Sequence, residues 1–76
     1  MAVTSVIVEF EDGAGEAVLN SLAMIDNVSV YGVKENQIVA VIEGKDMNSV
    51  EETMKGMYAI DRILGVFPVF SGDYPE

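Results

Sequence analysis

Neither cysteine nor histidine occurs in this chain of 76 residues. Their absence removes the usual zinc ligand sets, the thiol nucleophile and the Ser-His pair of many hydrolases. We therefore predict that the chain holds no metal, has no catalytic residue and is not an enzyme. A small domain without disulfides is also more typical of the cytoplasm than of secretion.

Basic residues are scarce as well. Four Lys and Arg stand against thirteen Asp and Glu, which gives a formal net charge of -9 at pH 7. A surface of this charge repels nucleic-acid backbones and anionic membranes and attracts cationic groups over about a Debye length. The charge balance predicts a basic partner and argues against nucleic acid and lipid.

Long apolar runs are missing too. No segment is long enough to span a membrane, and the first residues lack the basic region that opens a signal peptide. Half of the residues are nevertheless apolar, enough for a chain of this length to fold on its own. We predict a single domain over residues 1–76, with residues 71–76 as a frayed tail.

Hydrophobic periodicity divides the chain into six elements. Apolar, β-branched runs predict strands over residues 3–10, 28–33, 37–43 and 63–71. Helical spacing predicts one helix from Asp12, a candidate cap, to about residue 26, with Val18, Leu22 and Ile25 on one face. A second helix is predicted from Asp46 or Asn48 to around residues 58–61, with Met47, Val50, Met54 and Met57 on its apolar face.

The βαββαβ order predicts an α+β ferredoxin-like sandwich. Its four-stranded antiparallel sheet has the order 4-1-3-2, counting strands along the chain, with two helices on one face. We expect the helical crossovers to make the two central strands, 3–10 and 37–43, parallel to each other. Pro68 cannot donate to a central ladder, so the last strand belongs at an edge or contains a bulge.

The face without helices is predicted to carry apolar side chains. Alternation points Val6, Val8, Phe10, Ile38, Ala40, Ile42, Val28, Val30 and Gly32 toward the helices. The outward set then includes Ile7, Tyr31, Val33, Val39 and Val41, whereas the facing of Phe67, Val69 and Phe70 is not decided. Such a patch is typical of an interface, either with another molecule or with a second copy in a homodimer. Alternatively, β-branched residues favour central strands whatever they face.

Two carboxylates are predicted to lie on the same face. With parallel central strands, Glu9 and Glu43 both come at a strand end and should form a neighbouring pair. The planar guanidinium group of arginine has paired N–H donors that match the two oxygens of a carboxylate, so such a pair of glutamates could bind arginine side chains. Two solvated glutamates are the alternative, and Glu11, Asp12 and Asp46 compete for the same role.

Three segments together resemble a known family. They are Thr4-Ser5-Val6-Ile7-Val8-Glu9, Gln37-Ile38-Val39-Ala40-Val41-Ile42-Glu43 and Ile63-Leu64-Gly65-Val66. They are similar to the NapD family, cytoplasmic chaperones of the periplasmic nitrate reductase, and Pro68 is a departure from its pattern. The resemblance implies a ferredoxin-like fold that binds the twin-arginine signal peptide of the catalytic subunit as a helix. It also implies that export is restrained until the molybdenum cofactor is loaded, with no cofactor bound by the chaperone.

Adjacent arginines followed by an apolar helix would suit an acidic rim beside an apolar sheet. We therefore predict a peptide-binding surface made of Ile7, Glu9, Tyr31, Val33, Val39, Val41 and Glu43. The competing hypothesis is a regulatory domain of the ACT or Lrp-effector type. Domains of that type have the same element order and bind small metabolites as dimers.

Overall fold

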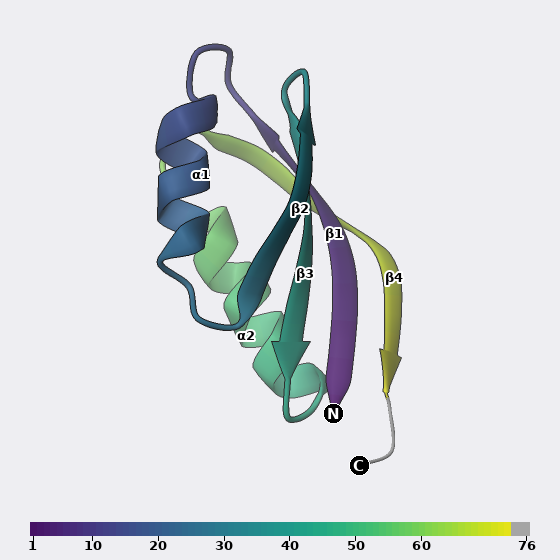
Figure 1. The fold of residues 1–76 in the computed structure, drawn as a ribbon. Helices are drawn as coiled ribbons and strands as arrows, with labels where there is room; N and C mark the ends of the chain where they lie inside the picture. The colour runs from purple at the N-terminus through teal and green to yellow at the C-terminus, as the bar shows by residue number, and fades with distance from the viewer. Residues whose placement is uncertain (74–76) are drawn as a thin grey trace.

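A computed structural model describes residues 1–73 of the chain as a sheet with two helices packed on one side (Figure 1). The elements are β1 (Ala2–Phe10), α1 (Gly15–Ala23), β2 (Val28–Lys34), β3 (Gln37–Gly44), α2 (Met47–Tyr58) and β4 (Ile63–Asp73). The strand order is β2-β3-β1-β4. The predicted βαββαβ arrangement and sheet order are confirmed.

Strict alternation along β1 builds the core. Its residues switch between buried and half-buried at every step, so that Val6, Val8 and Phe10 face the helices as predicted. On β3, Ile38, Ala40 and Ile42 are fully buried in the same layer. The helices cover this layer with Val18 and Leu22 from α1 and Val50 and Met57 from α2.

The two helices begin differently. Asp46 precedes α2, and its carboxylate accepts a hydrogen bond of 2.9 Å from the backbone N–H of Ser49, as the capping prediction requires. Asp12 does not cap α1, which starts after Ala14 without a side-chain cap. The Asp12 carboxylate instead accepts from the Asn36 amide in the β2–β3 turn, because Glu11, Asp12 and Gly13 form a separate turn before the helix.

The two central strands, β1 and β3, are antiparallel. The predicted parallel alignment is wrong, because each helical crossover joins a central strand to an edge strand: α1 connects β1 to β2 and α2 connects β3 to β4. A crossover makes β1 and β2 run the same way, and the β2–β3 hairpin then reverses β3.

A bulge at Tyr31 changes the facing of β2. Val30 lies opposite Ala40, but Gly32 lies opposite Val39, so Tyr31 is an extra residue. Directly opposed residues share a face of the sheet. Gly32 therefore joins the helix-free face with Val39, and Val33 joins the helix side with Ile38. The predicted facing of Gly32 and Val33 is the reverse of the observed one.

The edge strand β4 has two irregularities and includes Pro68. Its register against β1 shifts at Leu64 and again at Val69, each an extra residue. Between the shifts Phe67 lies opposite Ile7, and beyond them Phe70 lies opposite Ser5, so both rings stand on the helix-free face. Residues 71–73, predicted as part of a frayed tail, continue β4 and pair with β1; residues 74–76 lie outside the described part of the chain.

Candidate functional site: the open face of the sheet

The side of the sheet away from the helices, here called the open face, has an apolar centre. Rows of opposed residues cross it, one running through Gly32, Val39, Ile7 and Phe67 and the next through Ser29, Val41, Ser5 and Phe70. Val39, Phe67 and Phe70 are 45%, 49% and 53% exposed, and Ile7 and Val41 are half-buried between them. No element of residues 1–73 covers this surface, and exposed patches of this kind mark interaction sites.

The two phenylalanine rings lie along β4 and lean away from each other. A Cβ atom added to Gly65 would lie only 2.6 Å from the Phe67 ring, and one added to Gly72 would lie 3.3 Å from the Phe70 ring. Each ring therefore covers a glycine two residues away on the same strand. The glycines let both rings lie flat against the sheet and widen the apolar surface toward the β4 edge.

Five of the seven predicted peptide-binding residues lie on the open face. They are Ile7, Glu9, Val39, Val41 and Glu43. Tyr31, the extra residue of the β2 bulge, is 72% exposed beside this surface. Val33 is not part of it, because the bulge moves it to the helix side.

Glu9 and Glu43 do not form a pair. Glu9 lies opposite Gln37, whereas Glu43 lies opposite Val3 near the start of β1. Antiparallel central strands place the two carboxylates at opposite ends of the open face, so the predicted carboxylate rim is wrong. Phe67 and Phe70 were in turn absent from the predicted site, because a proline and two bulges in one strand hide its alternation.

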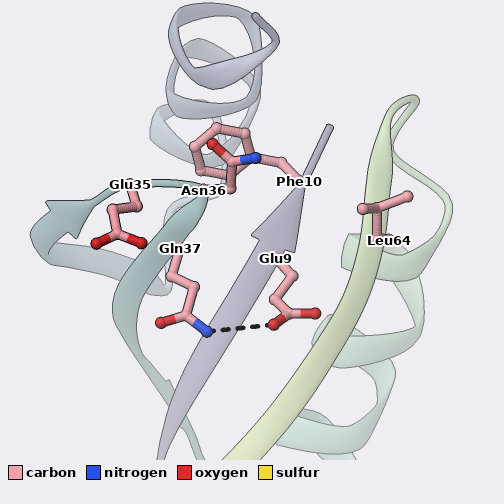
Figure 2. A pocket seen from close by; sticks show the side chains of 6 residues that line it. All are labelled: Glu9, Phe10, Glu35, Asn36, Gln37 and Leu64. Atoms are coloured by element: carbon pink, nitrogen blue, oxygen red, sulfur yellow. Dashed lines mark hydrogen bonds between the residues drawn. The ribbon is translucent and has the colours of Figure 1, made fainter. Parts of the chain in front are cut away.

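A hollow of about 350 Å³ lies at the Glu9 end of the sheet (Figure 2). Its lining comes from the end of β1, the β2–β3 turn and the start of β4: Glu9, Phe10, Glu35, Asn36, Gln37 and Leu64. The Gln37 amide donates a hydrogen bond of 3.2 Å to the Glu9 carboxylate, as Figure 2 shows. Two glutamates, two amide residues and the exposed Leu64 thus border one concave place.

The first 73 residues of the chain match the family model described as NapD protein. The chain belongs to the NapD family. The resemblance predicted from three strand segments is therefore confirmed over almost the whole length. None of the curated proteins matches the sequence.

This NapD family member also has the fold of a solved structure, the E. coli Tat proofreading chaperone protein NapD. The two structures superpose with a TM-score of 0.84 over 97% of this chain and 79% of the other, at 18% sequence identity. At that identity the likeness concerns the fold. The prediction that the chain is not an enzyme agrees with its membership of the NapD family.

The other acids predicted as competing arginine receptors already have partners. Glu11 lies 3.8 Å from the Arg62 guanidinium, which also donates to the Asp12 carbonyl oxygen. Asp46 caps α2 at the other end of the molecule. Within residues 1–73 no three acidic side chains are placed to hold a metal ion, and neither helix has the length and apolar character that a membrane crossing needs.

Proposed function

We propose that this NapD family member is a cytoplasmic chaperone that binds a twin-arginine signal peptide on its open face. The peptide belongs to the catalytic subunit of a periplasmic nitrate reductase, and binding restrains its export until the molybdenum cofactor is loaded. The observation that carries the proposal is the uncovered apolar surface of Ile7, Val39, Val41, Phe67 and Phe70 in a chain of this family. The E. coli relative, a Tat proofreading chaperone, supports the same assignment.

The physical fit is that of a helix laid on an apolar surface. An amphipathic helix buries its apolar side chains against Ile7, Val39 and Phe67. Binding therefore removes the apolar surface of both the helix and the sheet from water, which is favourable. Arginines at one end of the helix then meet carboxylates at the border of the surface. The net charge of -9 accelerates the encounter with such a cationic peptide.

The test is a calorimetric titration with two synthetic peptides that differ only in having Arg-Arg or Lys-Lys before the same apolar segment. We expect the Arg-Arg peptide to bind more tightly, because lysine cannot form the bidentate contact. Failure of both peptides to bind at high micromolar concentration would contradict the proposal.

The competing metabolite-binding hypothesis requires a dimer. Light scattering during size-exclusion chromatography, with and without peptide, distinguishes the chaperone hypothesis from the metabolite-binding hypothesis. A monomer that forms a one-to-one complex supports the chaperone, and a stable dimer that buries the open face supports the alternative.

A further inference from the structure

We infer that the signal peptide lies in one direction on the open face, antiparallel to β1, with its arginines over the hollow at the Glu9 end. This inference rests on the proposed function and adds the polarity of the bound peptide. It assigns the arginine-binding role to Glu9 and Glu35, and it removes Glu43 from that role.

The open face is about as long as one apolar helix. From Val3 to Glu9 along β1, the surface extends about 20 Å at the usual rise of a strand. A helix needs about 13 residues to cover that distance, close to the length of the apolar segment of a signal peptide. The apolar helix therefore occupies the centre of the face, and the arginines that precede it are left at one end.

The two ends of the open face differ in the carboxylates that they offer. Glu9 and Glu35 line the same hollow, and the hydrogen bond that Glu9 accepts comes from the neutral Gln37 amide. At the other end Glu43 faces outward beside Val3, and the nearby Asp46 is engaged by the Ser49 backbone N–H. Within residues 1–73 the Glu9 end thus brings two carboxylates to one concave site with no ion pair to either, and Lys34 lies opposite Gln37 in the same row.

An arginine side chain has two parts that need different contacts. Its apolar stem needs contact while its planar head needs carboxylates. The hollow supplies both, since the exposed Leu64 lines it together with the two glutamates (Figure 2). The positive end of the peptide helix dipole points the same way, because the arginines precede the helix.

The polarity can be measured with a spin label on the peptide, since the chain has no cysteine that could take up the label. Synthetic twin-arginine peptides carry a nitroxide on a cysteine placed either before the arginines or after the apolar segment. In ¹⁵N–¹H spectra of the complex, the first label should broaden the amides of Asn36 and Gly65, and the second those of Gly44 and Gly72. The reverse pattern, or equal broadening at both ends, would overturn the inference.

A matched pair of variants tests the carboxylates. Glu9→Gln combined with Glu35→Gln should weaken Arg-Arg peptide binding about fivefold at low salt, and Glu43→Gln should leave the affinity nearly unchanged. Equal losses in both variants would overturn the assignment. If the unaltered chain binds no peptide at all, the proposed function itself fails, an outcome distinct from binding in the wrong direction.

Discussion

Glu35 has an unusual backbone conformation for its residue type. It occupies the first central position of the two-residue turn between β2 and β3, with a φ of 56°. Positive φ at this position favours glycine, since a Cβ atom is strained there. A glutamate in such a place carries a backbone cost that glycine would avoid, which fits the proposed role of its side chain in the hollow.

Replacing Glu35 with Gly should therefore stabilise the fold and weaken peptide binding. We expect an increase in the free energy of unfolding of about 0.5 kcal/mol, because relief of the strained φ exceeds the greater entropy of glycine in the unfolded chain. Urea denaturation measures the stability and calorimetry the affinity. A variant that is less stable than the unaltered chain would contradict the conformational argument.

Asp46 makes the stability of the fold depend on acid pH. The hydrogen bond from the Ser49 backbone N–H, followed by one from its side chain, lowers the pKa of Asp46 below its usual 3.8. A lowered folded-state pKa contributes stability above the unfolded-state value, and this contribution is lost as the pH falls through the folded-state pKa.

Variants at Asp46 can isolate this contribution. Asn caps a helix about as well as Asp but does not titrate, so Asp46→Asn should keep most of the stability at pH 7 and lose less of it below pH 4. Asp46→Ala should be less stable at pH 7 in urea denaturation. Identical acid profiles for the unaltered chain and the Asn variant would show that Asp46 does not contribute.

At the scale of the elements, regular strands could be predicted in detail and irregular ones could not. Alternation correctly placed the inward side chains of β1 and β3 because their pairing has no register shift. The bulges at Tyr31, Leu64 and Val69 each add one residue, which reverses the alternation beyond it. No composition signal marked Tyr31, so the facing of Val33 was wrong, while Pro68 marked β4 as irregular without locating its shifts.

This difference between strands provides a matched test of the open face. Val39 and Val33 are similarly exposed, at 45% and 49%, but lie on opposite sides of the sheet. Val39→Asp should abolish peptide binding, because it places a charge in the apolar centre, whereas Val33→Asp should bind normally. Circular dichroism checks that both variants are folded, and a loss of binding in Val33→Asp alone would contradict the facing derived from the register.

The contact between Gly65 and Phe67 can be tested in the same way. A methyl group at position 65 would lie 2.6 Å from the Phe67 ring, so Gly65→Ala should push the ring off β4 and reduce peptide affinity several-fold. In a Phe67→Ala background the same change should have little further effect, because the displaced ring is gone. Additive losses in this double-mutant cycle would mean that the two residues act independently.

At the scale of the whole molecule, the charge of -9 should govern how fast the peptide arrives. Raising the salt from about 0.1 M to 1 M shortens the Debye length from about 10 Å to about 3 Å. Stopped-flow fluorescence should show a marked decrease in the association rate constant and a smaller change in the dissociation rate constant. An association rate that does not vary with salt would rule out steering by the acidic surface.

The pairing of the first strand with the last also has a consequence for synthesis. Thr4 and Ser71, whose hydroxyl oxygens are 3.1 Å apart, are separated by 67 positions in the chain. Contacts between such distant segments form late, after the loop between them has closed. On the ribosome β1 emerges well before β4, so it lacks its β4 neighbour until that strand has also been made. Phe67 and Phe70 join the open face only then, so its apolar surface is completed after both helices and the other three strands have been made.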